Sequence, residues 1–307
     1  MYRTIVVGYD GTDDADDGLA LAGQLARLTG ARLLLAFAYA GDSIPVGIGA
    51  ASVGKNLRTE AEEVLERGLK HLPYGVNGRI RPLRRASPAH ALEELAEDEQ
   101  ADLLVIGSTA LGPVGRVVIG SVGGRLMHGS PCAVAVAPKG YRDTDPDIPQ
   151  KIGVCWDGSP ESELALDTAI RFAGIGGGEL FLLTAVDPNA YVYASYPGVF
   201  TIPDEEALRR TAEANLAEGL ARVPHGVPAT GETIFGYPAS VLSQRAADSD
   251  FDLLIAGSRG YGPMRRVLLG GVSERLMRKA HCPVVIVPRG AHIEERDEAD
   301  DNSALVS

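Results

Sequence analysis

The sequence contains one long segment twice. Residues 107–138, GSTALGPVGRVVIGSVGGRLMHGSPCAVAVAP, recur 150 positions later as GSRGYGPMRRVLLGGVSERLMRKAHCPVVIVP, and 14 of the 32 aligned positions are identical. Earlier in each copy, Asp10 in IVVGYDGT corresponds to Asp157 in IGVCWDGS. A period of this length has the size of a domain and is far longer than the units that stack into solenoids. We therefore expect two domains of one fold.

The repeat divides the 307-residue chain into four parts. We expect a first domain over residues 1–138, a linker over 139–150, a second domain over 151–288 and a disordered acidic tail over 289–307. The linker is rich in turn formers and charges, and the tail carries many acids and few apolar residues. With 45% apolar residues, each domain is long enough to bury its own core.

Apolar runs and amphipathic patterns alternate along both copies. The first copy predicts strands in TIVVGYD, ARLLLAFAY, RIRPLRRA, DLLVIGS and AVAVAP, with helices over 12–28, 53–72, 87–97 and 121–128. The second copy predicts strands in the same order, with helices over 159–173, 204–221, 238–247 and 272–280. Such alternation is typical of a parallel sheet covered on both faces. The expected fold class is α/β, with two doubly wound parallel-sheet domains.

Charge and composition restrict the classes of molecule that the protein is expected to bind. A formal net charge of −12 and a pI near 5 disfavour general binding to nucleic acid or to an anionic membrane. The first ten residues lead directly into a strand pattern without the charged and apolar segments of a secretory leader, so we expect a cytoplasmic protein. The six histidines and three cysteines lack metal-ligand spacing, which predicts no metal site and favours buried structural thiols over a redox switch.

The candidate ligand site lies where the strands end. In an open parallel sheet, ligands bind outside the carboxyl ends of the strands, at the point where strand order reverses. Asp10 and Asp157 end the first strand of each copy, and Gly107 and Gly257 end the fourth. Each of these glycines opens a loop that leads to a helix. Its glycines allow close approach of backbone to ligand, and its amides suit phosphate oxygens. An ordinary strand-to-helix connection is the alternative for these glycines.

These residues resemble the universal stress protein family in its tandem-domain form. The resemblance rests on G-x2-G-x9-G-[ST] after the fourth strand, V-G-x-D-x-[ST] at the amino end and [HR]-x-P/C-P-V-x-V-V-P at the carboxyl end. It covers nearly the whole chain apart from the linker and the tail. It implies five-stranded sheets of order 3-2-1-4-5, with the adenine nucleotide alpha hydrolase-like fold. It also implies ATP in each domain, with or without Mg²⁺, and domains paired through their last strands.

The resemblance also implies roles for individual residues. Asp10 and Asp157 would meet the adenosine, the backbone at Ala38 and Ala185 would meet the adenine, and the glycine loops would hold the phosphates. The candidate residues of the first site are Gly8, Asp10, Ala38, Gly107, Thr109, Ala110, Gly112, Arg116, Gly120, Ser121 and Val122. Those of the second site are Asp157, Ala185, Gly257, Arg259, Gly260, Gly262, Arg266, Gly270, Gly271, Val272 and Ser273.

Each copy departs from the motif at one position. Ala110 replaces the second glycine in the first copy, and Gly271 replaces the serine or threonine in the second. An alanine permits the turn if its φ is negative, and a glycine loses a hydroxyl donor but keeps the amide. We expect both sites to bind, with unequal affinity.

Three functions stay open at this point. The first is an ATP-binding regulator of a stress response, in which nucleotide occupancy changes loop order and the contacts with an unidentified protein partner. The second is a nucleotide-free interaction module, which the changes at Ala110 and Gly271 favour. The third is a phosphate-transferring or hydrolytic enzyme. No Walker lysine, Mg²⁺-binding carboxylate pair or placed base is visible, so no catalytic residue is predicted and at most slow hydrolysis is expected. We also expect a homodimer, because a second chain could cover edge strands.

Overall fold

The structure is a computed structural model of the whole chain. It describes residues 2–40, 50–109, 117–118, 120–144, 148–187, 205–258, 271–277 and 280–288, with backbone alone for 50–55 and 272. The predicted acidic tail, 289–307, lies outside the described residues.

The first repeat alternates strands and helices as predicted. Its strands are β1 (Thr4–Gly8), β2 (Arg32–Tyr39), β3 (Gly78–Arg84), β4 (Leu103–Gly107) and β5 (Ala133–Ala137). Its helices are α1 (Asp13–Thr29), α2 (Ala50–Leu69), α3 (Pro88–Asp98) and α4 (Ser121–Gly129).

The second repeat has the same order. Its strands are β6 (Lys151–Cys155), β7 (Glu179–Val186), β8 (Ala229–Phe235), β9 (Leu253–Gly257) and β10 (Val284–Val287). Its helices are α5 (Pro160–Gly176), α7 (Glu205–Ala221), α8 (Pro238–Asp248) and α9 (Gly271–Met277).

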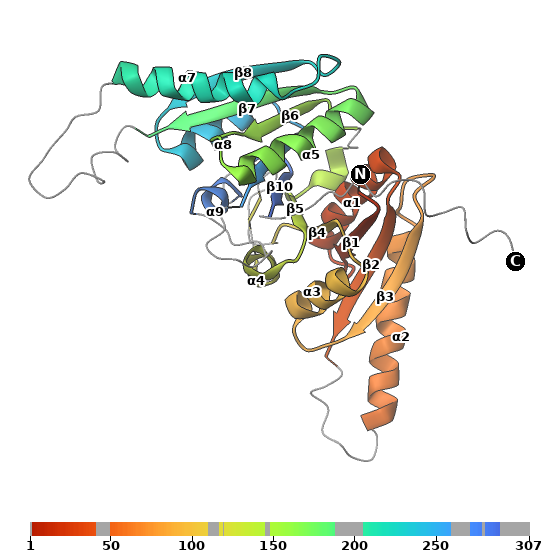
Figure 1. Cartoon of the computed structure of the whole chain (residues 1–307). Helices are drawn as coiled ribbons and strands as arrows, with labels where there is room; N and C mark the ends of the chain where they lie inside the picture. Colours follow the sequence, from red (N-terminus) through yellow and green to blue (C-terminus); the bar gives the residue numbers. More distant parts are fainter. Residues whose placement is uncertain are drawn as a thin grey trace, which may run out of the picture.

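The ten strands form one continuous sheet of order β3-β2-β1-β4-β5-β10-β9-β6-β7-β8 (Figure 1). Within each repeat the strands are parallel, and the predicted order 3-2-1-4-5 is confirmed in both halves. The halves join where β5 and β10 pair antiparallel, with Val136 opposite Val284 and Val134 opposite Ile286. The last strand of each half therefore has its edge covered within the chain. The expected homodimer stays a prediction, and β3 and β8 are the strands at the two ends of the sheet.

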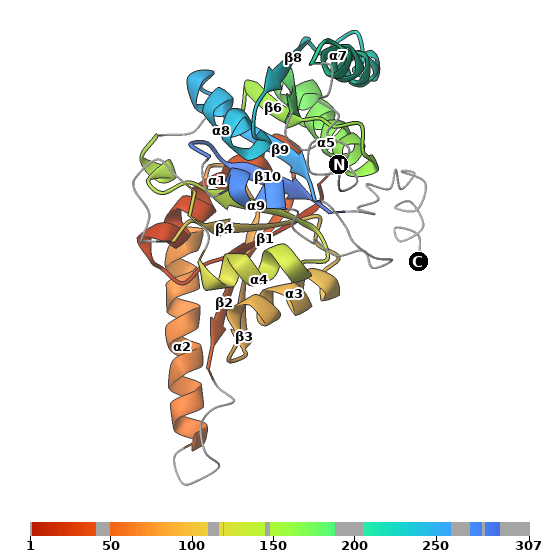
Figure 2. The ribbon, with the colours of Figure 1, turned by 90° about the vertical axis from the view of Figure 1, so that its left-hand side faces the viewer.

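Helices cover both faces of this sheet, as the alternation predicts (Figures 1 and 2). One buried cluster joins the sheet to α1, α2, α5 and α7, and a second joins its other face to α3, α4, α8 and α9. Each cluster contains residues of both repeats, so the two cores are continuous across the β5–β10 pair. Helix α1, which follows β1, and helix α4, which follows β4, consequently lie on opposite faces.

The segment predicted as a linker packs on the first repeat. Residues Tyr141–Thr144 form a 3₁₀ turn, η1, in which the buried Tyr141 donates its hydroxyl to Gln24 Oε1 at 2.7 Å. The buried carboxylate of Asp17 accepts hydrogen bonds from the backbone amides of Gly140 and Arg142. Such charge-assisted bonds to a buried carboxylate are among the stronger hydrogen bonds in proteins. The described part of this segment is therefore fastened to α1.

Capping residues that are visible in the sequence set the ends of several helices. Thr12 and Ser159 cap α1 and α5, because their hydroxyls accept from the amides of Ala15 and Ser162. Gly30 ends α1 in the left-handed region with a φ of 72°. The prediction that Pro88 begins a helix after Ser87 is confirmed by α3.

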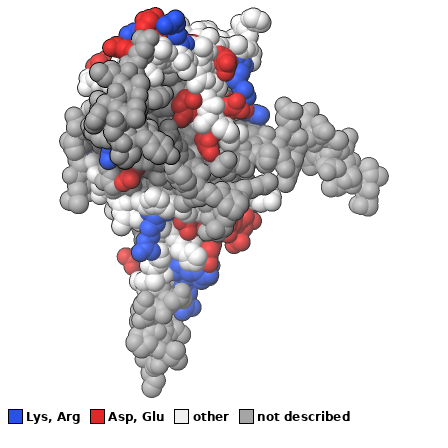
Figure 3. Space-filling view, turned by 60° about the vertical axis from the view of Figure 1, so that its left-hand side comes forward, with Lys and Arg blue, Asp and Glu red and all other residues white. Residues whose placement is uncertain are grey.

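Charge on the described surface is mixed. On the face shown in Figure 3, acidic and basic side chains are interspersed rather than gathered by sign. Among the described helices, none combines the length and the apolar character needed to cross a membrane.

Helix α1 packs closely on the end of β4 through two glycines. A Cβ on Gly18 in α1 would lie 2.7 Å from the backbone nitrogen of Gly107 at the end of β4. Gly18→Ala should lower the free energy of unfolding by about 1–3 kcal/mol through overpacking, although alanine favours helix by about 1 kcal/mol. Gly174→Ala is the matched control, because a Cβ there meets no atom within 4 Å, and should raise stability. Urea denaturation followed by circular dichroism measures both; equal effects would contradict the packing constraint.

Candidate functional site

A pocket of about 320 Å³ lies at the carboxyl ends of β1, β2 and β4 in the first repeat. Among the described residues, it is lined by Gly8, Tyr9, Asp10, Thr12, Asp14, Ala15, Ala36, Phe37, Ala38, Pro88, Leu92, Ile106, Gly107, Ser108, Thr109, Gly120, Ser121, Val122 and Gly123. This volume is within the range of about 300–1,000 Å³ that is usual for small-molecule sites. The pocket lies between α1 on one face of the sheet and α4 on the other, as the strand reversal between β1 and β4 requires.

Asp10 has a structural task besides facing the pocket. Its Oδ1 accepts hydrogen bonds from the Thr12 amide at 3.1 Å and the Thr12 hydroxyl at 2.7 Å. Thr12 in turn caps α1, so the carboxylate fixes the turn between β1 and that helix. Its Oδ2 makes no hydrogen bond to another described residue. The side chain is exposed, and this second oxygen gives the pocket an acceptor.

The glycines of the motif have different reasons to be glycine. A Cβ on Gly107 would lie 1.6 Å from the carbonyl oxygen of Asp14, so α1 packs on this residue too closely for any side chain. Gly257 is similar, because its Cβ would lie 2.5 Å from the Glu161 carbonyl. Gly120 has a φ of −79°, and its Cβ would meet Thr109 at an ordinary 3.4 Å. Packing therefore explains Gly107 and Gly257, whereas at Gly120 neither backbone strain nor a contact with a described residue requires glycine.

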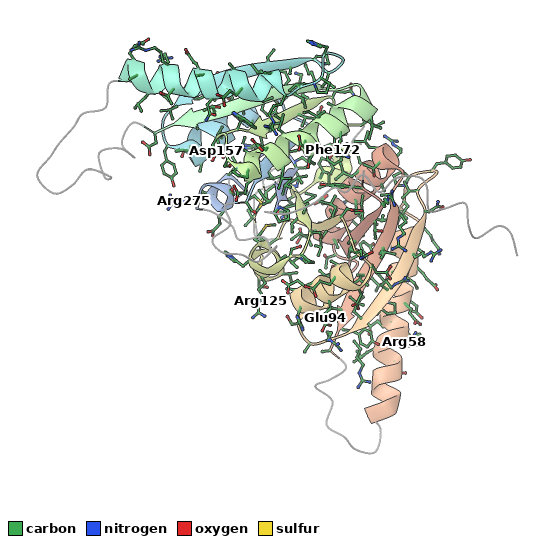
Figure 4. The ribbon with its side chains drawn as sticks, viewed as in Figure 1. Arg58, Glu94, Arg125, Asp157, Phe172 and Arg275 are labelled. Carbon is green, nitrogen blue, oxygen red and sulfur yellow. The ribbon has the colours of Figure 1, made fainter. Side chains whose placement is uncertain are left out.

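Helix α4 points its amino end at the pocket. Gly120 is its N-cap residue and provides no side-chain cap, and the next three residues, Ser121, Val122 and Gly123, line the pocket. The first amides of a helix have no acceptor within the helix and carry the positive end of its dipole. This end of the pocket suits an anion. Arg125, one turn further along α4, points away from the fold in Figure 4.

The described residues on either side of 110–116 are hydrogen-bonded to each other. The Ser108 hydroxyl accepts from the Val118 amide at 2.5 Å and donates to the Val118 carbonyl at 3.0 Å, and the Thr109 amide also donates to that carbonyl. The neighbouring Val117 is fully buried, and its amide donates at 3.0 Å to the carbonyl of Ala280 in the second repeat. The two ends of the loop are thus held together, and one end is also held by the other domain.

The second repeat has a smaller pocket of about 100 Å³ at the equivalent place. Among the described residues, it is lined by Cys155, Trp156, Asp157, Ser159, Glu161, Ser162, Leu183, Ala185, Pro238, Leu242, Ala256, Gly257, Ser273 and Leu276. Asp157 holds the turn before α5 through Ser159, as Asp10 does through Thr12. In Figure 4 it lies at the end of α5 that is farther from Phe172. Ser273 differs from the first repeat, because its hydroxyl donates to the Gly257 carbonyl at 3.0 Å.

The structure brings together most of the predicted residues that it describes. Around the first pocket are Gly8, Asp10, Ala38, Gly107, Thr109, Gly120, Ser121 and Val122, and around the second are Asp157, Ala185, Gly257 and Ser273. Gly271 begins α9 but does not line the second pocket, and only the backbone of Val272 is described. The predicted residues Ala110, Gly112, Arg116, Arg259, Gly260, Gly262, Arg266 and Gly270 lie outside the described residues.

Sequence reasoning missed the apolar walls of the first pocket. Phe37, Pro88, Leu92 and Ile106 read as ordinary core positions, and only their place at strand and helix ends makes them pocket residues. Tyr9 was missed as well. Its hydroxyl donates to Asp16 Oδ1 at 2.8 Å, and burial together with this carboxylate raises the pKa of Tyr9 above its usual range. Tyr9 is therefore neutral at physiological pH.

The three cysteines have no partner sulfur and lie in protected places. Cys132 and Cys282 are buried, and Cys155 is half-buried at the second pocket. Burial raises the pKa of each thiol to about 12, which leaves little reactive thiolate at neutral pH. Among the described residues there is no group of three or more histidine, cysteine, aspartate or glutamate side chains placed to hold a metal ion.

The fold defines the chain as a tandem doubly wound α/β protein with a pocket at the strand reversal of the first repeat and a smaller one at the equivalent place in the second. The profile of the universal stress protein family matches residues 1–138 and again residues 149–288. A universal stress protein of Mycobacterium tuberculosis is 33% identical over 210 residues, which is 66% of this chain and 66% of that relative. The chain belongs to the universal stress protein family.

Relatives of the same tandem size support this assignment. A universal stress protein of Mycolicibacterium smegmatis is 29% identical over 297 residues, covering 92% of this chain and 96% of the relative. The crystal structure of a universal stress protein from Archaeoglobus fulgidus aligns with a TM-score of 0.69 at 19% identity, over 94% of this chain and 98% of that one. This second likeness shows the shared fold.

The clamp at the base of the loop is testable by comparing the repeats. Ser108→Ala leaves the Val118 amide without its acceptor and should lower the free energy of unfolding by about 1–3 kcal/mol. Its equivalent, Ser258, is buried, and its hydroxyl has no hydrogen-bond partner in the described structure, so Ser258→Ala should change stability little. Urea denaturation of both variants measures the difference. Equal losses would show that Ser108 does not act as a clamp.

Proposed function

We propose that the first pocket binds an adenine nucleotide, ATP with or without Mg²⁺, and that the chain is a nucleotide-dependent regulator of a stress response in the cytoplasm. The observation that carries this proposal is the uncapped amino end of α4, which shares one pocket of suitable volume with the Asp10 carboxylate. Membership of the universal stress protein family supports the stress role at the level of the family.

The donor set at α4 fits a polyphosphate. The amides of Ser121, Val122 and Gly123 are those that a helix leaves without an acceptor, and phosphate binding at helix amino ends uses such groups. Gly120 places no side chain next to these amides, and no contact with a described residue requires glycine there. Backbone amides and the hydroxyls of Ser121 and Thr109 would hold the phosphates.

The rest of the pocket fits a nucleoside. Leu92, Ile106 and Phe37 offer apolar surface of the kind that buries a flat base, and the backbone at Ala38 would supply its polar contacts. Asp10 has an acceptor oxygen left after fixing its turn, and ribose hydroxyls donate to such an oxygen. The triphosphate of ATP would carry the negative charge that the amides at the amino end of α4 attract.

The lining favours regulation over fast chemistry. The titratable side chains among its described residues are Tyr9, Asp10 and Asp14. Tyr9 is neutral and bound to Asp16, and Asp10 is committed to the α1 turn. This part of the pocket has no lysine or histidine to act on a phosphoryl group. Bound nucleotide would contact Thr109, whose amide donates to the Val118 carbonyl, and the neighbouring Val117 would transmit occupancy to the second repeat and to a protein partner.

One observation favours the alternative of a nucleotide-free interaction module. Gly107 and Gly257 are required by the packing of α1 and α5, so two glycines of the motif would persist in a chain that bound no phosphate. The two proposals differ in the need for the Asp10 carboxylate and the open α4 terminus. Binding of a nucleotide separates them.

Asp10→Asn isolates the role of the charge. Asparagine keeps one side-chain oxygen for Thr12 and loses the second acceptor, so the variant should fold and bind Mg²⁺-ATP about 10- to 100-fold more weakly, the effect of one hydrogen bond to a charged group. Isothermal titration calorimetry measures this ratio. Asp98→Asn, on the exposed end of α3, is the matched control and should bind as the unaltered chain does. Equal affinity of both variants would remove Asp10 from the site.

A further inference from the structure

The two pockets occupy equivalent places, but they differ in the pair of strand residues that lines each one, which we call the pocket floor. In the first repeat, Gly8 and Ala36 are directly opposite each other in the pairing of β1 with β2. In the second repeat, Cys155 and Leu183 are directly opposite each other in the pairing of β6 with β7. All four residues line their pockets. The same pair of sheet positions therefore carries two small residues in one pocket and two larger residues in the other.

Part of this difference is compensated by the opposite wall. A Cβ on Gly8 would lie 3.1 Å from Leu92 and 3.5 Å from Ile106, so the first pocket has little room for a side chain at that point. In the second repeat, Ala256 takes the place of Ile106 and offers room beside Cys155. The exchange of glycine and isoleucine for cysteine and alanine is thus close to neutral in volume.

The exchange of Ala36 for Leu183 has no such compensation. Leu183 is 2% exposed and belongs to the buried cluster under α8 and α9, and it also lines the pocket. The facing residues Pro238 and Leu242 are the equivalents of Pro88 and Leu92, so the wall opposite Leu183 has side chains of the same size in both pockets. The pocket volume falls from about 320 Å³ to about 100 Å³, below the usual range for a drug-sized ligand.

The other end of the second pocket is also more closed. Ser273 stands where the first repeat has Gly123, and its hydroxyl bonds to the Gly257 carbonyl at the end of β9. This side chain lies in the first turn of α9. The equivalent position in α4 is a glycine, which adds no side chain to the first pocket. A nucleotide would therefore meet larger side chains both at the floor and beside the helix.

We propose that Leu183, with Cys155 opposite it, is a specificity-determining residue that excludes a full nucleotide from the second pocket, so that each chain binds one adenine nucleotide, in the first repeat. This inference rests on the proposed function. It predicts an asymmetric protein. One repeat binds the ligand, and the other holds Val117 of the first repeat, because the Ala280 carbonyl accepts a hydrogen bond from the Val117 amide.

Calorimetry with Mg²⁺-ATP tests the stoichiometry. The unaltered chain should bind one nucleotide, and hydrogen exchange should show protection at 121–123 and no change at 271–273. Two nucleotides per unaltered chain, or protection at 271–273, would overturn this inference and leave the proposed function intact. No binding at any concentration would overturn the proposed function itself.

Exchange of the floor residues tests the cause. The double variant Cys155→Gly with Leu183→Ala should raise the stoichiometry to two, and the reciprocal Gly8→Cys with Ala36→Leu should abolish binding. Cys132→Ala, a buried cysteine away from both pockets, is the control and should leave one site. If the opened variant does not fold, Leu183→Ala alone should still give weak second-site binding. A folded opened variant that keeps one site would show that the floor does not control occupancy.

Discussion

Strand β1 is followed by a helix on one face of the sheet and strand β4 by a helix on the other, and the rest of the site depends on this divergence. Parallel strands need right-handed crossovers, so the sheet grows outwards from β1 in one direction and from β4 in the other. The chain leaves a crevice between α1 and α4 that no crossover fills. The Asp10 turn and the amino end of α4 face each other because both begin at this reversal.

The second constraint is the antiparallel pairing of β5 with β10. It merges two domains of the same fold into one ten-stranded sheet with cores that continue across the junction. It also places Ala280 of the second repeat against Val117, next to the loop of the first pocket. Val117, which lies shortly before α4, is therefore held by a hydrogen bond to the second repeat. The duplicated sequence has therefore made one joined sheet rather than two separate domains.

Sequence patterns predicted the fold well because they report burial and backbone geometry. Near-continuous apolar strands such as LLVIG, together with the Ser87–Pro88 helix start, predicted the elements, and the family resemblance supplied the strand order that the structure confirms. The motif predicted which chain segments meet at the crevice. It could not show why each glycine is there: Gly107 is required by packing, whereas no contact with a described residue requires Gly120 to be glycine.

The motif could not predict the size of either pocket. The difference lies in Ala36 and Leu183, apolar strand residues that look like core in any sequence, and their effect depends on the register that sets them at the pocket floor. The proposed function requires that the first pocket holds an adenine nucleotide. A crystal structure of the chain grown with Mg²⁺-ATP would test this by direct observation. Nucleotide density should lie between Asp10 and the amino end of α4, with the phosphates against 121–123. Nucleotide bound elsewhere, with this pocket empty, would contradict it.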